Sequence, residues 1–327
     1  MKKKAMVVGP LFFDYYKDIL KEFQKRGYDT LFYSDRPSSN FISNAILRLN
    51  YKSQKGKANR YVDRIIKETE GQKIDIALFI LGQCFNNDHI RKMKAAHPET
   101  KFVFYAWDSI DLFPNMATFG ESFDKCYTFD RVEAKQLNYE FLPLYYCEES
   151  DPSSGNDFKY NYSSVMTIKK GKMDKYRKIM SLIPSEVKEK SYEFLYIQSK
   201  LVYLFYKLTL KEFRGCKMKD FHYKKITRSE NYQILKDSRV VLDCPMMKQI
   251  GLTMRTIEAL HAKKKIITTN KDIVNYDFYS SDNIYVVGEE TKSIPTEFFL
   301  TPFNEKYTLS EKYSISHFID TIIGGND

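Results

Sequence analysis

An arginine and a glutamate, Arg255 and Glu258, lie three residues apart in a segment that predicts a strand, a loop, a helix and a second strand. Residues 239–243 (RVVLD) form a short apolar, β-branched run typical of a buried parallel strand. The loop that follows contains Gly251, and Thr253 stands at the N-cap position of the helix. Ligands of open α/β sheets bind beyond the carboxyl ends of the strands, where helix N-termini point. Arg255 and the free amides of the first helical turn therefore predict an anion-binding site.

A surface ion pair is the alternative interpretation of Arg255 and Glu258. Oppositely charged residues on adjacent helical turns commonly pair in solvent and contribute little. Because short motifs are weak evidence of function, spacing alone leaves both interpretations open.

The chain has 327 residues, enough for two domains of ordinary size. Its formal net charge of +10 favours an anionic partner, such as nucleotide phosphates, nucleic acid or an acidic membrane surface. Five scattered cysteines without a CxxC pair argue against a disulfide framework or a structural zinc site. They indicate a reducing, cytoplasmic location. No uncharged run approaches the length of a membrane span.

Strand-like and helix-like segments alternate along the chain, which predicts an α/β fold with mostly parallel sheets. The first half lacks a GxGxxG run, so a dehydrogenase is disfavoured. Residues 151–157 (DPSSGND) have the composition of a linker. We therefore expect domains at residues 1–150 and 151–327, with the last helix, around residues 314–323, crossing back to the first domain.

Several chemistries lack their sequence signals. The five histidines never pair at a zinc spacing, and neither a GxSxG nor a P-loop motif occurs. The basic stretches lack a helix-turn-helix or RNP-like pattern, so no nucleic-acid partner is expected. What remains is a set of residues near expected strand ends: Asp14, Asp35, Trp107, Asp108 and Asp130 in the first half, and Lys169, Lys170, Lys172, Arg255, Glu258 and Asn270 in the second.

Acids in one half and cations in the other suit group transfer from a nucleotide-activated donor. The cations would hold the diphosphate leaving group, and an acid would take the proton of the acceptor hydroxyl. Asp14 and Asp108 are the candidate bases, and Trp107 could stack on a sugar, with Asp35 also on the acceptor side. The alternative is structural: Asp14 as the N-cap of a helix beginning at Tyr15, and Asp108 as the cap of a short turn.

Residues 251–270 (GLTMRTIEALHAKKKIITTN) resemble the donor-binding segment of GT-B glycosyltransferases that build bacterial capsule and lipopolysaccharide. Residues 102–111 and 123–146 also resemble the N-terminal half of that family. The resemblance implies two Rossmann-like domains facing across a cleft, with Glu258 holding the ribose of a nucleotide sugar. Two departures stand out. Ile250 occupies a position where the broader fold often has a second glutamate, and Gly171 comes later than the usual diphosphate-loop glycine.

The implied activity is transfer of a sugar from a nucleotide-sugar donor to a glycan acceptor, expected to be lipid-linked. Gly251, Thr253, Arg255 and the Lys169–Lys172 loop would hold the diphosphate, so neither a metal nor another cofactor is expected. A peripheral position on the inner membrane face is a further expectation, through the N-terminal lysines and residues 48–64. The alternatives are a non-catalytic nucleotide-sugar-binding partner subunit and a basic membrane or nucleic-acid binder.

Overall fold

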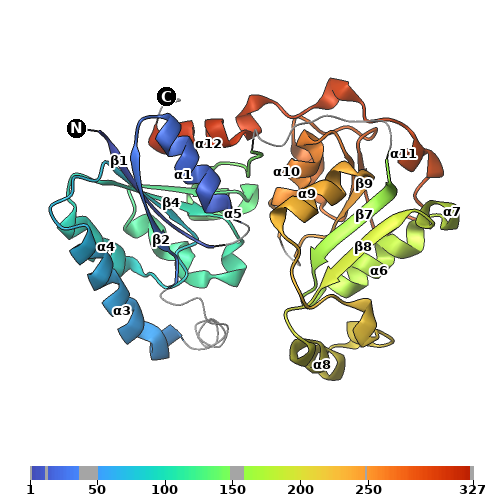
Figure 1. Ribbon diagram of the computed structural model, residues 1–327, viewed down its shortest axis with the longest axis horizontal. Helices are drawn as coiled ribbons and strands as arrows, with labels where there is room; N and C mark the ends of the chain where they lie inside the picture. Colours follow the sequence, from blue (N-terminus) through green and yellow to red (C-terminus); the bar gives the residue numbers. More distant parts are fainter. Residues whose placement is uncertain (1, 12–13, 37–50, 148–157, 247–248, 325–327) are drawn as a thin grey trace. The chain divides into compact units, whose positions relative to one another are not determined.

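The computed structural model describes residues 2–11, 14–36, 51–147, 158–246 and 249–324 (Figure 1). The chain divides into two compact units: Met1–Leu144 with Ile315–Asp327 forms unit 1, and Tyr145–Ser314 forms unit 2. The linker expected at residues 151–157 lies outside the described residues.

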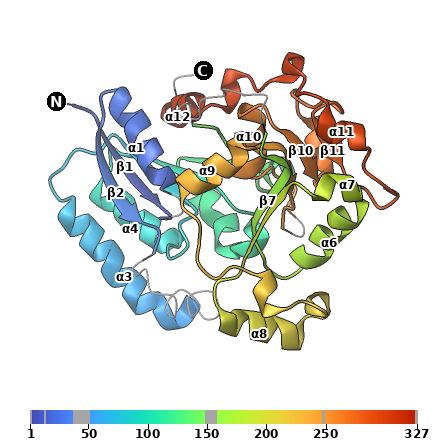
Figure 2. The same ribbon diagram turned by 45° about the vertical axis from the view of Figure 1, so that its right-hand side comes forward.

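Unit 1 is built on a six-stranded parallel sheet with the strand order β2-β1-β3-β4-β5-β6. Its strands are β1 (Lys4–Gly9), β2 (Asp29–Ser34), β3 (Ile76–Ile80), β4 (Lys101–Ala106), β5 (Lys125–Thr128) and β6 (Glu140–Phe141). Its longer helices are α1 (Tyr15–Lys25), α3 (Tyr51–Glu68), α4 (Asn87–Ala96), α5 (Arg131–Leu137) and α12 (Ile315–Ile323). Helices α1 and α12 cover one face of the sheet, and α3 and α4 cover the other (Figures 1 and 2).

Unit 2 is built on a five-stranded parallel sheet with the strand order β11-β10-β9-β7-β8. Its strands are β7 (Tyr160–Thr167), β8 (Ser191–Tyr196), β9 (Ser238–Asp243), β10 (Lys265–Thr268) and β11 (Ile284–Val286). Its helices are α6 (Lys172–Leu182), α7 (Ser185–Lys188), α8 (Lys200–Thr209), α9 (Arg228–Lys236), α10 (Met254–His261) and α11 (Thr296–Leu300). The predicted α/β class with parallel sheets is confirmed.

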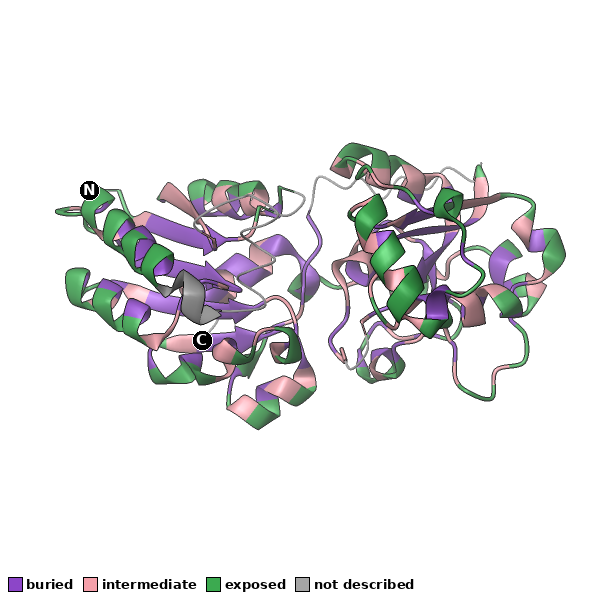
Figure 3. Ribbon diagram, turned by 90° about the horizontal axis from the view of Figure 1, so that it is seen from below, coloured by how far each residue is buried: buried purple, intermediate pink, exposed green. Residues whose placement is uncertain are grey.

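The central strands are apolar runs buried between two helical layers (Figure 3). Such runs are expected where helices cover both faces of a parallel sheet. Among the described residues, no helix combines the length and the apolar composition needed to cross a membrane.

Each sheet has one point where the direction of strand addition reverses. The chain adds β8 on one side of β7 and β9 on the other, and it adds β2 and β3 on opposite sides of β1. Right-handed crossovers then place α6 on one face of the second sheet and α9 and α10 on the other (Figure 2). The carboxyl ends of β7 and β9, and those of β1 and β3, therefore frame the ligand positions typical of such sheets.

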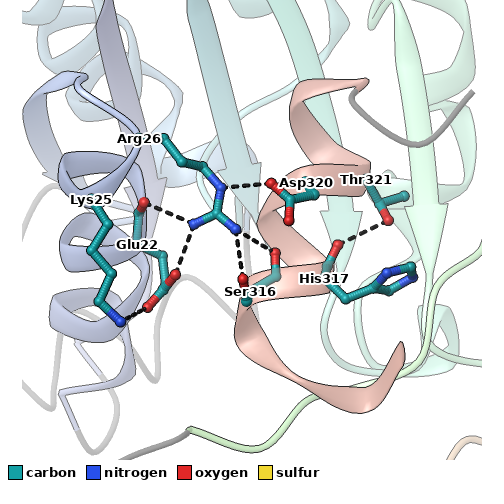
Figure 4. A network of polar contacts seen from close by, with 7 residues as sticks. All are labelled: Glu22, Lys25, Arg26, Ser316, His317, Asp320 and Thr321. Atoms are coloured by element: carbon teal, nitrogen blue, oxygen red, sulfur yellow. Dashed lines mark hydrogen bonds and ion pairs between the residues drawn. The ribbon is translucent and has the colours of Figure 1, made fainter. Parts of the chain in front are cut away.

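Helix α12 belongs to unit 1, where Arg26 at the end of α1 binds it (Figure 4). The Arg26 guanidinium donates to the Asp320 carboxylate at 2.6 Å and to the Ser316 hydroxyl at 2.8 Å. It also pairs with the buried Glu22 carboxylate at 2.7 Å. On the sheet side, the ring of Phe318 meets that of Tyr105 edge-on at 4.8 Å. The last helix thus completes the apolar core of unit 1.

Replacing Arg26 with alanine should lower the free energy of unfolding of unit 1 by about 2–4 kcal/mol. The substitution removes charge-assisted bonds to two helices and leaves the buried Glu22 with a weaker partner. Urea unfolding measures the loss, and limited proteolysis should cut α12 earlier. Lys25→Ala is the matched control, because Lys25 pairs with the same carboxylate from a half-exposed position. It should cost less than about 1 kcal/mol, and equal losses would contradict this role for Arg26.

Candidate functional site

The loops that follow β7, β9 and β10 meet at the carboxyl edge of the second sheet, because these three strands are neighbours in the order β10-β9-β7. Lys169, Lys170 and Lys172 follow β7, and Asn270 follows β10. The loop after β9 leads through Gly251 into α10. The topology therefore gathers the donor-side residues predicted from the sequence at the reversal point of one sheet.

The Asp243 carboxylate, at the end of β9, holds the start of α10 in place. It accepts a hydrogen bond from the Thr253 hydroxyl at 3.1 Å and another from the Thr256 hydroxyl at 3.0 Å. Thr253 is the N-cap of α10, as predicted, and its hydroxyl oxygen accepts the Thr256 amide at 3.2 Å. Asp243 is buried, so these bonds lie away from water. Asp243 is not among the site residues predicted from the sequence, although its position at the end of an apolar run was a usable signal.

The first turn of α10 offers unused hydrogen-bond donors. Within the described part of the chain, the amides of Met254 and Arg255 have no acceptor. The Arg255 guanidinium forms no ion pair with any described residue, Glu258 included, so the surface pair considered above is not formed. Glu258 is half-buried one turn further along the same helix. Free amides, a free guanidinium and the helix dipole together make an anion-binding surface.

Three cations act on one another at this edge of the sheet. Burial lowers the pKa of the Lys172 ammonium to about 8, and repulsion from Arg255 and Lys169 adds to the effect, while Asp243 opposes it. Burial also lowers the pKa of Lys175, whose ammonium donates to the Pro245 carbonyl at 3.2 Å. Like charges held this close favour binding of a negatively charged ligand.

The start of α6 is capped by a residue far away in the sequence. Helix α6 begins at Lys172, and Gly171 is its left-handed N-cap (φ 84°). The cap is a distant carboxylate: Glu212 accepts the Gly171 amide at 2.6 Å and the Met173 amide at 3.0 Å. Because Glu212 is about forty residues away, no local pattern predicts this cap. It also occupies two amides that would otherwise be available to a phosphate.

Asn270 and Gly251 have structural contacts in this region. The Asn270 amide nitrogen donates to the Ile250 carbonyl at 2.8 Å and, at 3.4 Å, to that of Gly251. The Asn270 amide oxygen accepts the Asp272 amide, so Asn270 also caps the turn after β10. Asn270 thus binds the loop that leads into α10. Lys170, which was also predicted as a donor-side residue, lies exposed on the surface.

In unit 1, the structure brings Asp14 and Trp107 into one neighbourhood. The ring of Tyr15, next to Asp14, lies 5.6 Å from that of Trp107. Asp14 occupies the N-cap position of α1, as the structural alternative predicted, but its backbone is left-handed (φ 59°) and its side chain makes no capping hydrogen bond. Its exposed carboxylate accepts the Lys17 ammonium at 2.9 Å. A non-glycine residue in this conformation is uncommon and suggests a local functional constraint.

Asp108 is half-buried in the loop after β4, and a glutamate not predicted from the sequence supports this loop. The Glu133 carboxylate accepts the Ser109 hydroxyl at 2.6 Å and the Ile110 amide at 2.9 Å. Burial raises the pKa of Glu133. Glu133 therefore positions the segment that carries Trp107 and Asp108.

Asp35 lies beneath the surface of unit 1, only 1% exposed, at the end of β2. Burial raises the pKa of its carboxyl group to about 6, although Arg36 and the Gln83 backbone stabilise the charged form. One of its carboxylate oxygens has no hydrogen-bond partner among the described residues. Asp35 can thus exchange a proton near neutral pH, but its burial separates it from a ligand on the surface. Among the described residues, no three His, Cys, Asp or Glu side chains are grouped to hold a metal ion.

Solved structures share this fold. Neither a family model nor a curated protein matches the sequence. Sucrose-phosphate synthase from Thermosynechococcus elongatus superimposes with a TM-score of 0.64 at 8% identity, covering 99% of both chains. HepE of Anabaena, solved with UDP and glucose, superimposes with a TM-score of 0.58 at 8% identity, covering 99% of this chain and 98% of that chain. Both are GT-B glycosyltransferases, and the present chain has the GT-B fold.

Proposed function

We propose that the chain is a glycosyltransferase that moves a sugar from a nucleotide-sugar donor to a glycan acceptor. The observation that carries the proposal is the repulsion of Lys172 by Arg255 and Lys169, together with the α10 amides that lack an acceptor among the described residues, at the reversal point of the second sheet, with Glu258 one turn away. HepE, which shares the fold, was also solved with UDP-glucose. We further propose a lipid-linked acceptor in surface polysaccharide synthesis, on the resemblance of residues 251–270 to enzymes of capsule and lipopolysaccharide assembly.

In this reaction the acceptor hydroxyl attacks the anomeric carbon of the donor sugar, and the nucleoside diphosphate leaves with the electrons of the broken bond. Arg255, Lys172 and the α10 amides stabilise the charge that develops on the diphosphate, in place of a metal ion. The acceptor proton passes to a carboxylate of unit 1, Asp14 or Asp108, while the Trp107 ring supports a sugar face. The Glu258 carboxylate accepts hydrogen bonds from the two ribose hydroxyls.

A second function has one observation in its favour. Glu212 already occupies two amides at the start of α6, where a diphosphate-binding loop would otherwise offer them. A protein that binds a nucleotide sugar without turnover, as a partner subunit, would tolerate this arrangement. A panel of nucleotide sugars separates the two functions. A transferase gives thermal stabilisation together with slow donor hydrolysis or transfer, and a binding subunit gives stabilisation alone. If no nucleotide sugar stabilises the protein, both proposals fail.

Replacing Glu258 with glutamine should weaken binding of the active nucleotide by about tenfold or more. The neutral amide loses charge-assisted acceptance from the ribose hydroxyls, worth about 1.5–3 kcal/mol per bond. Calorimetry with the ribo- and 2′-deoxyribonucleotide measures the effect, and the variant should discriminate less between them. Glu297→Gln, a glutamate on α11, is the matched control and should leave affinity unchanged. Wild-type affinity in Glu258→Gln would remove the ribose assignment.

Affinity for a nucleoside diphosphate should fall as the pH rises above about 8. Lys172 loses its proton near this pH in the free protein, and a bound anion raises its pKa, so binding takes up a proton in this window. UDP is a suitable probe because its phosphates stay ionised above about pH 7.5. We expect a loss of about three- to tenfold between about pH 7.5 and pH 9.5. Lys172→Gln should bind more weakly at the lower pH with a flatter profile, whereas the exposed Lys170→Gln should keep the wild-type profile.

Asparagine substitutions at Asp14 and Asp108 should identify the base. The variant that lacks the base should lose transfer by about two to four orders of magnitude, because the acceptor proton has no recipient. It should still bind the donor, since the cations and Glu258 lie in unit 2. Asp18→Asn, an acid on the first turn of α1, serves as the control. Near-normal transfer by both variants would place the base elsewhere or indicate a retaining reaction.

A further inference from the structure

Helix α8 carries a row of large apolar side chains on its outer surface. Leu201, Leu204, Phe205 and Leu208 are 77%, 44%, 62% and 86% exposed. Their spacing of three, one and three residues puts them on one helical face. Single exposed leucines are ordinary, but a contiguous apolar face indicates a binding surface. Figure 1 draws α8 at the lower edge of its unit, and Figure 3 views the molecule from that side.

The opposite face of α8 is well anchored, so the exposed row belongs to a rigid element. Tyr203 is buried, and Val202 and Tyr206 pack against the core of unit 2. The Tyr203 hydroxyl donates to the Cys216 carbonyl at 2.9 Å, and the Lys207 ammonium donates to the same oxygen at 2.9 Å. Helix α8 therefore has one face in the core of unit 2 and one face outside it.

The surroundings of the apolar row are strongly basic. Residues 200–225 contain eight basic and two acidic side chains, and one of those acids, Glu212, is buried on the α6 amides. Lys200, Lys211 and Lys219 are exposed, and none forms an ion pair among the described residues. On a helical wheel, Lys200 and Lys207 border the apolar row on one side. A second copy of the chain would bring such lysines against each other in a two-fold pairing.

We infer that α8 docks this protein onto an anionic lipid surface, with Leu201, Leu204, Phe205 and Leu208 entering the headgroup boundary. An apolar face bordered by lysines is the pattern of helices that lie in a membrane interface. The stems of lysines such as Lys200 and Lys211 extend along apolar surface while their ammonium groups reach lipid phosphates. This surface differs from the N-terminal lysines and residues 48–64 considered in the sequence analysis. It concerns lipid binding alone and stands or falls independently of the transfer reaction.

The test is flotation of the full chain with vesicles of phosphatidylglycerol and phosphatidylcholine, compared with phosphatidylcholine alone. The wild type should float with the anionic vesicles, less with neutral ones, and less at high salt. The double variant Leu201→Glu/Leu208→Glu should lower the vesicle affinity by about tenfold or more. Both positions are highly exposed, so the melting transition should be unchanged. Lys200→Gln/Lys211→Gln should reduce binding to anionic vesicles only.

The matched control is Leu11→Glu/Leu300→Glu, which changes the same residue types and charge at exposed positions outside α8. Its flotation should stay within about twofold of the wild-type value, once the general repulsion between the two added glutamates and the anionic vesicles is taken into account. The inference would be overturned by no flotation of the wild type, by equal flotation of the α8 variant, or by a loss confined to Lys2→Gln/Lys3→Gln. A wild-type dimer that becomes monomeric in Leu201→Glu/Leu208→Glu without lipid would assign the face to a second copy instead.

Discussion

The candidate donor site depends on one buried carboxylate. Asp243 ends β9, and its carboxylate accepts hydrogen bonds from both threonine hydroxyls at the start of α10. These bonds hold the start of the helix in a fixed position relative to the end of the strand. This bond pattern determines where the α10 amides, Arg255 and Glu258 point. A buried carboxylate needs such donors, because an unsatisfied charge away from water is costly. Among the residues that the structure describes, no acid forms an ion pair with the Arg255 guanidinium.

Electrostatics differ between the two helix N-termini at this edge. At α6 the chain supplies its own anion, Glu212, which accepts the Gly171 and Met173 amides. At α10 the amides and the guanidinium remain without a described acceptor, and the neighbouring Lys172 already has a lowered pKa. A negatively charged ligand therefore gains most at α10. This difference favours α10 over the Lys169–Lys172 loop as the position for the diphosphate of the proposed donor.

Local sequence patterns predicted the strands, most of the longer helices and the Thr253 cap, because burial and capping act over a few residues. The parallel sheets followed from the alternation of these elements. Contacts between distant residues could not be predicted from local patterns. Glu212 bonds to the α6 amides and Glu133 bonds to the loop that carries Asp108, and in each case the two segments share no sequence pattern. The exposed face of α8 was missed for a related reason, since an apolar helix gives no sign of which side meets the core. The roles of Asp14 and Asp108 are still predictions.

The return of α12 to the first unit has a consequence for the order of folding during synthesis. Unit 2 is one continuous stretch, whereas unit 1 needs Ile315–Ile323, which the ribosome adds after all of unit 2. The surface around Tyr105 therefore stays uncovered while unit 2 is made, although its strands are already available. Nascent chains are prone to aggregation while such apolar surface is exposed. A chain released before α12 is made would contain a folded second unit and an incompletely folded first unit, and it would be a natural substrate for chaperones.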